Sequence, residues 1–284
     1  MDFNSYDPED FYDELFKSKG KPRPGTKLLI DRLKSFPKGE ILRRQKAAEA
    51  ALFNMGVTFT VYSDESGIEK IFPFDILPRI IEPQDWEHIE KGLKQRIYAL
   101  NLFIDDVYHD QKIIKDGVIP KDILYSSKCI QPQCMGLNPP KGIWCHITGS
   151  DLVKDADGRF YVLEDNLRCP SGVSYLLENR EIIKQAFPGL FASLGERPVS
   201  DYSNMLLNML QHLSDKPNPT VAVLTPGIYN SAYFEHSYLA QQMGVQLVTG
   251  QDLLVKNKNV YMQTTKGLQQ VDVIYRRIDE HCRL

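Results

Sequence analysis

The segment from Gly142 to Arg168 constrains the fold more than any other part of this 284-residue chain. It reads as two β-strands joined at Asp155-Ala-Asp-Gly158, a sequence typical of a hairpin turn. Side chains alternate between the two faces of a strand. The alternation in the second strand predicts one face with Phe160, Val162, Glu164, Asn166 and Arg168. The other face would carry Tyr161, Leu163, Asp165 and Leu167.

The polar end of this strand suggests a chemistry. Glu164, Asn166 and Arg168 would place a carboxylate, a carboxamide oxygen and a guanidinium in a row. Magnesium prefers hard oxygen ligands and shares them with phosphate oxygens, and a guanidinium pairs with a phosphoryl group. Asp151 on the preceding strand could join them. A loop of two or four residues would put Asp151 on the face of Glu164, whereas a three-residue loop with a glycine bulge at Gly158 would turn it away, so the register stays open.

Simpler interpretations exist for each motif. An isolated Glu-x-Asn is more often a solvated sheet face than a metal site. The Asp-x-Asp-Gly turn lacks the further ligands of a calcium loop, and Thr225-Pro-Gly227 lacks a Walker-type phosphate pattern. Cys145 and His146 are more typical of a core and a surface residue than of a metal site.

The rest of the chain mixes predicted helices and strands. Residues 1–16 could form a short acidic amphipathic helix. Apolar spacing predicts helices over 27–55 with a break near 37–39, and over 83–108, 174–187 and 231–244. Strands are predicted at 57–62, 68–74, 221–224, 245–248 and 271–276, with a small hairpin around 257–259. The order strand, helix, strand over 221–248 is the unit of a parallel sheet.

These elements predict a mixed α/β (α+β) fold in three parts. Residues 1–26 would be an acidic segment with a flexible connector, residues 27–215 would carry the helices and the polar hairpin, and residues 216–284 would form an incomplete βαβ unit. The last part ends one turn after a strand, so we expect too few elements to cover both faces of its sheet, and a tendency to associate. A fragment, a frameshifted reading frame or a split gene would each explain such an ending.

Composition excludes several classes of partner. Lys plus Arg number 34 and Asp plus Glu 37, for a net charge of −3, so no basic excess suggests a nucleic acid or an anionic membrane. No apolar run reaches the ~20 residues of a membrane span, and the start lacks a secretory signal. The five cysteines are odd in number and include no CxxC pair. The cytoplasm is the expected compartment.

Several long blocks resemble a known family. The chain from about residue 25 to Asp279 is similar to the circularly permuted ATP-grasp type 2 proteins, relatives of glutathionylspermidine synthetase. The blocks that carry the resemblance occur in the family's order and lie at 74–81, 92–101, 149–175, 177–180, 224–227, 230–236 and 271–279.

The resemblance implies a circularly permuted ATP-grasp fold with a pre-ATP-grasp-like βαβ unit at its C-terminal end. Such enzymes use ATP and Mg²⁺ to phosphorylate a carboxylate, and they pass the acyl group from the acyl-phosphate to an amine. Carried over by position, Asp151, Glu164 and Asn166 would hold magnesium, and Arg168 would neutralise charge on the transferring phosphoryl group. The loop of Pro170, Ser171 and Gly172 would close over the phosphates or the acyl-phosphate.

The chain departs from the family after the Arg-Arg-Ile-Asp block. Family members continue further, and the adenine-binding strand and the phosphate-binding lysines have no counterpart assigned here. We therefore expect an N-terminal fragment of a carboxylate–amine ligase that is inactive alone, with small carboxylate and amine substrates. The alternatives are a non-catalytic remnant, or one half of a split enzyme that binds a separately encoded C-terminal half. A metal-dependent hydrolase ranks last, because no activated nucleophile or histidine ligand set supports it.

Overall fold

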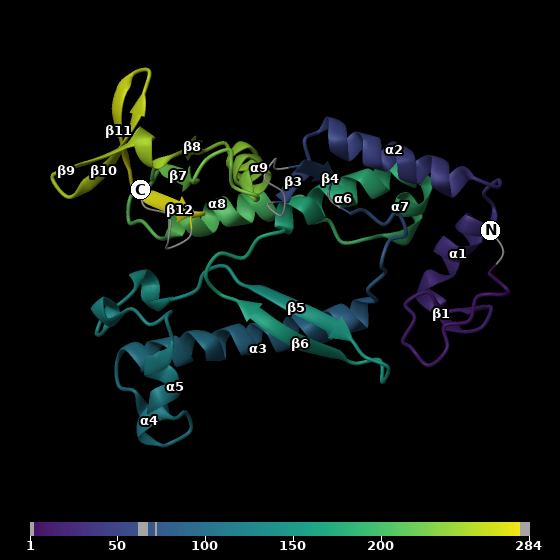
Figure 1. The fold of residues 1–284 in the computed structure, drawn as a ribbon, viewed down its shortest axis with the longest axis horizontal. Coiled ribbons are helices and arrows are strands. Elements are labelled where there is room, and N and C mark those ends of the chain that lie inside the picture. Colours follow the sequence, from purple (N-terminus) through teal and green to yellow (C-terminus); the bar gives the residue numbers. More distant parts are fainter. Residues whose placement is uncertain (1–2, 62–67, 72, 279–284) are drawn as a thin grey trace. The chain divides into compact units, whose positions relative to one another are not determined.

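The computed structural model describes residues 3–61, 68–71 and 73–278. The chain forms two compact units (Figure 1). Unit 1 comprises residues 1–80, 154–159 and 171–284, and unit 2 comprises residues 81–153 and 160–170. These limits differ from the segment boundaries expected at 26 and 215, which stay a prediction about domain organisation.

Unit 1 begins with turns and short strands. β1 (Phe16–Ser18) pairs with β2 (Lys21–Pro22), and a 3₁₀ turn at Pro24–Thr26 leads into α1. The expected helix over residues 1–16 is wrong. The Asp13 carboxylate accepts the backbone N–H groups of Leu15 and Phe16, and such side-chain bonds compete with a helix.

Four helices of unit 1 build two apolar clusters. They are α1 (Lys27–Lys34), α2 (Glu40–Asn54), α6 (Val173–Ala186) and α7 (Pro188–Leu194). Buried residues of α1 pack with Phe187 and Leu190, and α2 packs on α6 through Leu52, Tyr175 and Ile182. The predicted helical break between α1 and α2 is confirmed, as is the antiparallel hairpin of β3 (Thr58–Val61) and β4 (Ile68–Ile71). Residues 62–67 and 72 of that hairpin prediction lie outside the described residues.

The predicted strand–helix–strand unit is confirmed. β7 (Val221–Leu224) pairs in parallel with β8 (Gln246–Val248) across α9 (Tyr233–Met243), and β12 (Val273–Arg276) pairs in parallel on the other side of β7. The strand order is β12-β7-β8. The sequence prediction did not include α8 (Tyr202–His212), although its buried Ser203, Leu206 and Leu210 have helical spacing.

Both faces of this parallel sheet are covered, so the prediction of too few elements is wrong. All four residues of β7 are buried. Helices α8 and α9 both contact β7. Ala222 and Leu224 pack with Met262 and Val271 of a second, antiparallel sheet. That sheet consists of β9 (Leu253–Lys256), β10 (Asn259–Thr264) and β11 (Gly267–Val271), so the single strand expected at 271–276 is divided between β11 and β12.

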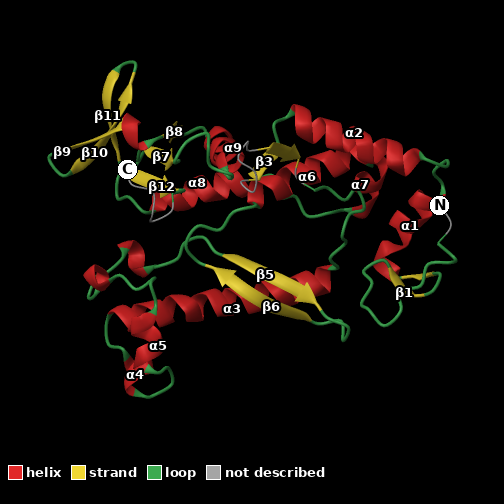
Figure 2. Ribbon diagram, in the orientation of Figure 1, coloured by secondary structure: helices red, strands yellow, loops and turns green. Residues whose placement is uncertain are grey.

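Unit 2 is built on one long helix. α3 (Pro83–Tyr108) has the limits that its apolar spacing predicts, and the hairpin of β5 (Gly149–Lys154) and β6 (Phe160–Asn166) runs beside it (Figure 2). Short helices α4 (Lys112–Lys115) and α5 (Lys121–Ser126) follow α3, and 3₁₀ turns lie at Pro132–Cys134 and Pro140–Gly142. The Asn101 side chain of α3 accepts the backbone N–H groups of Trp144 and Cys145, which fixes the approach to β5. Within the described residues, none of the helices combines the length and the apolar character that a bilayer span requires.

Candidate functional site

Contacts across the β5–β6 hairpin show which residues face each other. A Cβ built on Gly149 would lie 3.8 Å from the Cβ of Asn166. The Ser150 hydroxyl donates to Asp165 Oδ1 at 2.7 Å. Gly149 is therefore opposite Asn166, and Ser150 is opposite Asp165. One further step along each strand brings Asp151 opposite Glu164.

This pairing differs from the one expected for the loop that joins the two strands. The loop has three residues and a glycine bulge, because Asp155 N–H donates to Arg159 O, Gly158 N–H donates to Asp155 O, and Gly158 has a φ of +78°. Such a loop was expected to turn Asp151 away from Glu164. The alternation of β6 slips by one position, since Leu163 and Glu164 are both exposed, and a bulge with one extra residue in β6 accounts for the slip.

The slip changes the predicted faces. Asp151, Glu164 and Asn166 all lie on the exposed face of the hairpin. Phe160 and Val162 are half-buried on the other face, so their predicted grouping with Glu164 is wrong. The period-two pattern failed here because a bulge shifts every later side chain of its strand to the opposite face.

The three exposed side chains form a donor set suited to magnesium. The Asn166 amide nitrogen donates to Glu164 Oε1 at 3.1 Å, so the carboxamide oxygen of Asn166 is turned away from that carboxylate and can accept a cation. Two carboxylates and a carboxamide oxygen fit an ion that takes its remaining ligands from water and phosphate. Among the described residues no group of three or more His, Cys, Asp or Glu could enclose a metal. The arrangement fits a metal shared with a ligand, not one caged by protein.

The opposite face anchors the hairpin to α3. Arg96 Nε lies 2.6 Å from Asp165 Oδ2, and Ser150 binds the other carboxylate oxygen. Burial disfavours the charged carboxylate, but the hydrogen bonds from Ser150 and Arg96 and the charge of Arg96 outweigh it and lower the pKa of Asp165. Sequence reasoning gave Asp165 no role. Its place between Glu164 and Asn166 shows why the same strand can carry both a ligand face and an anchor.

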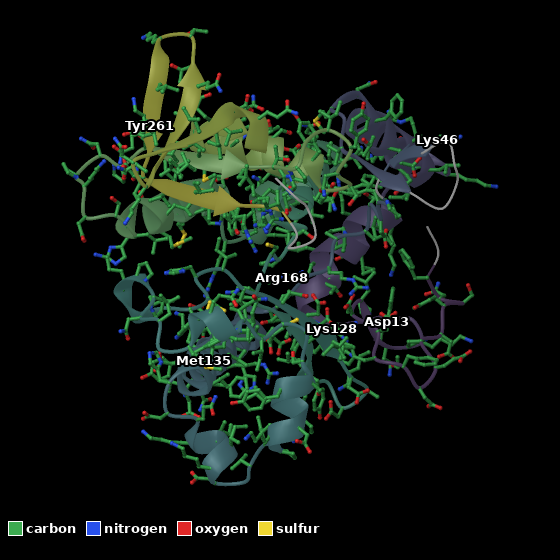
Figure 3. The ribbon with its side chains drawn as sticks, turned by 60° about the vertical axis from the view of Figure 1, so that its left-hand side comes forward. Asp13, Lys46, Lys128, Met135, Arg168 and Tyr261 are labelled. Carbon is green, nitrogen blue, oxygen red and sulfur yellow. The ribbon has the colours of Figure 1, made fainter. Side chains whose placement is uncertain are left out.

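The remaining predicted site residues follow β6. Arg168, labelled in Figure 3, is exposed two positions beyond the strand. Pro170 is half-buried, and a Cβ on Gly149 would come within 2.9 Å of the Pro170 Cβ. Ser171 is exposed at the start of the next stretch of unit 1. The structure thus keeps Asp151, Glu164 and Asn166 on one face, with Arg168 and Pro170 next along the chain.

The backbone N–H of Gly172 points into the protein. Its N–H donates to Glu235 Oε2 at 2.7 Å, and the same oxygen accepts the N–H of Ser174 at 3.2 Å and its hydroxyl at 2.9 Å. Gly172 precedes α6 with a φ of +110°. Of the three loop residues proposed to contact phosphates, Gly172 therefore has its amide engaged by Glu235, and Ser171 is the exposed member.

Glu235 belongs to a buried polar network that sequence reasoning missed. Arg277 Nη2 lies 2.6 Å from Glu235 Oε1, and the two side chains are 2% and 0% exposed. Next to Glu235, the Nδ1 atom of His236 lies 2.9 Å from the Thr225 hydroxyl. Burial and, secondarily, the Arg277 charge lower the pKa of His236 to about 4. The signal in the sequence was that 224–227, 230–236 and 271–279 were all similar to family blocks, yet none had an assigned role.

Comparison with known proteins decides the family. The model of the family described as circularly permuted ATP-grasp type 2 matches residues 78–283. The chain belongs to this family. An uncharacterized protein of Synechocystis sp. is 54% identical over 99% of the chain and 59% of that protein. An uncharacterized protein of Mycobacterium tuberculosis is 46% identical over 98% of the chain and 51% of that protein.

Two further similarities concern named proteins. A Frankia casuarinae protein provisionally named glutamate–cysteine ligase 2-2 is 35% identical over 95% of the chain and 31% of that protein. The solved structure of a glutathione synthetase-like effector from Globodera pallida matches 87% of the chain and 59% of that structure, with a TM-score of 0.55 and 12% identity. The latter shows the fold alone and, with the family match, confirms the expected mixed α/β ATP-grasp-like class. The chain spans 50% to 59% of the length of the first curated relatives.

Proposed function

We propose that this chain carries the magnesium-binding strand pair of an ATP-dependent carboxylate–amine ligase. The observation that carries the proposal is the common exposed face of Asp151, Glu164 and Asn166 on the β5–β6 hairpin. Membership of the ATP-grasp family and the glutamate–cysteine ligase name of a 35% identical relative support the same class of reaction. The substrates would be a small carboxylate and an amine.

Each proposed residue has a distinct task. Magnesium, when bound, would supply charge neutralisation to the phosphate oxygens of ATP. Asp151, Glu164 and Asn166 would hold that ion. Arg168, one alternation beyond Asn166, would pair with the transferring phosphoryl group, because a guanidinium matches phosphate oxygens in pairs. Ser171 would contact the phosphate or the carboxylate substrate through its hydroxyl and backbone N–H.

The direct test is calorimetric titration of the full chain with ATP, with and without magnesium. We expect magnesium-dependent binding in the natural chain and its loss in the double variant Glu164→Ala, Asn166→Ala. Asp157→Asn is the matched control, because it removes a carboxylate at the turn of the same hairpin and leaves the three ligands in place. Circular dichroism would establish that each variant is folded.

The outcomes separate the ligase from its rivals. Equal binding by the double variant and the natural chain would mean that ATP binds elsewhere, and would overturn the site. A folded natural chain that binds no ATP would overturn nucleotide binding by this chain alone, and would favour the second candidate, a non-catalytic or partner-binding half. Loss of binding in Asp157→Asn as well would show that hairpin stability, not ligand chemistry, controls the titration.

A further inference from the structure

We propose that Glu235, held by Arg277, is a positioning residue that fixes the segment leading from β6 into α6 and so sets the orientation of Ser171. The inference rests on the proposed function, because that function places Ser171 at the phosphate or carboxylate substrate. Neither Glu235 nor Arg277 contacts the proposed ligand. Both act through the backbone of Gly172 and the side chain of Ser174.

Helix α6 begins without a local side chain that could accept its first N–H groups. The first N–H groups of a helix have no partner within the helix, and a local Ser, Thr, Asp or Asn usually accepts them. Gly172 precedes α6 and has no side chain with which to do this. A carboxylate from α9 performs the task instead, since Glu235 accepts the N–H groups of Gly172 and Ser174.

Gly172 has a backbone conformation that needs support from outside the segment. With a φ of +110° it occupies a conformation that residues with a Cβ avoid, and glycine loses more conformational freedom on ordering than any other residue. Something outside the segment must therefore select one conformation. The 2.7 Å bond from Gly172 N–H to Glu235 is positioned to make that selection, and Ser171 is the residue directly before it.

Glu235 is itself held in place by hydrogen bonds to both of its carboxylate oxygens. Its Oε2 accepts three bonds from the α6 terminus, and its Oε1 lies 2.6 Å from Arg277 Nη2. A buried carboxylate needs such pairing, because an unpaired buried charge is costly. The backbone of Arg277 is in turn fixed to the sheet, since its backbone N–H donates to the backbone carbonyl oxygen of Leu224 at the end of β7. The parallel sheet thereby determines the geometry at the start of α6.

Both oxygens of Glu235 are engaged inside the protein, and its side chain is 0% exposed. Because both carboxylate oxygens already have partners within the protein, we assign Glu235 to positioning and not to ligand binding. The role of Glu235 also differs from simple helix capping. A cap would stabilise α6 alone, whereas a positioning residue also controls what Ser171 can bind.

The test compares variants of the full chain by two measurements. Glu235→Gln removes the charge and keeps the size, Arg277→Met removes the partner, and Arg277→Lys restores a positive charge. The first measurement is hydrogen exchange of the Gly172 and Ser174 amides by NMR. We expect exchange to rise about tenfold in Glu235→Gln and Arg277→Met and less in Arg277→Lys, with β7 amides unchanged. The second is magnesium-dependent ATP affinity, which should weaken about tenfold in the same order.

Leu210→Ala is the matched control, because it empties a buried position of α8 in the same unit without touching the network. It should lower the stability without changing either measurement. Gly172 exchange that rises no more in Glu235→Gln than in this control would overturn the positioning role. Increased exchange with unchanged ATP affinity would separate Ser171 from the ligand and also overturn it. If the natural chain binds no ATP, the proposed function fails, and the exchange measurement alone decides whether Glu235 fixes the segment.

Discussion

Gly149 and Pro170 approach so closely that a Cβ on Gly149 would lie 2.9 Å from the Cβ of Pro170. Atoms at that separation overlap, so Gly149→Ala must displace either β5 or the chain after β6. We expect the variant to lose about 1–3 kcal/mol of unfolding free energy, as overpacked sites do. Chemical denaturation would measure the loss.

A second glycine of the same unit gives the control. Gly92 lies within α3, and apart from its chain neighbours and the nearby backbone of the helix itself, no atom lies within 4 Å of a Cβ built there. Gly92→Ala should raise stability by about 0.5–1 kcal/mol, because alanine is the better helix former. Equal effects of the two variants would contradict the close contact at Pro170.

Stability should fall in mild acid because of His236. Its pKa is about 4 in the folded chain against an ordinary value of 6.5. Between pH 4 and pH 6.5, His236 is therefore protonated in the unfolded chain and neutral in the folded chain. The contribution of neutral His236 to the unfolding free energy is about 3 kcal/mol. It is complete above pH 6.5 and disappears as the pH falls towards 4. His236→Asn should flatten this part of the stability curve. Parallel curves for the two proteins between pH 4 and 6.5 would refute the assignment.

The anchor between β6 and α3 should depend more on Asp165 than on Arg96. The side chain of Asp165 is 8% exposed and that of Arg96 is 47% exposed. Asp165→Asn also weakens the bond from Ser150, so we expect a loss of about 1–3 kcal/mol. Arg96→Met breaks a pair open to solvent and should cost about 0–1 kcal/mol. Thermal unfolding of the two variants would show the order, and the reverse order would contradict it.

The turn between β9 and β10 can be improved. Asn257 and Lys258 have φ values of 52° and 63°, and Lys256 faces Asn259 across them. Two left-handed residues form a type I′ turn, which favours Asn-Gly. Lys258→Gly should therefore raise the unfolding free energy by about 0.5 kcal/mol. Lys256→Gly, within β9, should lower it, and a gain in that control would show that the turn is not the cause.

Patterns within one element predicted much of the fold. Pro83 and the apolar stripe marked the limits of α3, and the short apolar runs at 221–224 and 245–248 marked the parallel strands β7 and β8. Each of these signals depends on residues a few positions apart. The short strands and turns at the start of the chain were missed because Asp13 binds nearby backbone N–H groups, a competition that charge pattern alone does not show.

The sequence named the candidate site residues but left open whether Asp151 shares the face of Glu164. Asp151, Glu164 and Asn166 were named because their side chains offer oxygen ligands. Their shared face depends on the bulge at Leu163 and Glu164, and no glycine or other turn residue at that point of the sequence indicates a bulge. Glu235 and Arg277 were beyond local reasoning altogether. Their pairing joins distant segments, and a buried charge in a sequence looks no different from an exposed one.

The packing of α2 on α6 has a consequence for synthesis. Leu52 and Tyr175 share one buried cluster but are separated by about 120 positions, and the whole of unit 2 is made between them. At about 5–20 residues per second, the apolar face of α2 waits on the ribosome for roughly 6–25 s before its partner emerges. Unit 2 is complete only when residue 170 has been made, directly before the start of α6. Until then the nascent chain carries an unfinished insert and a helix without its α6 partner, the state in which a chaperone has most to bind.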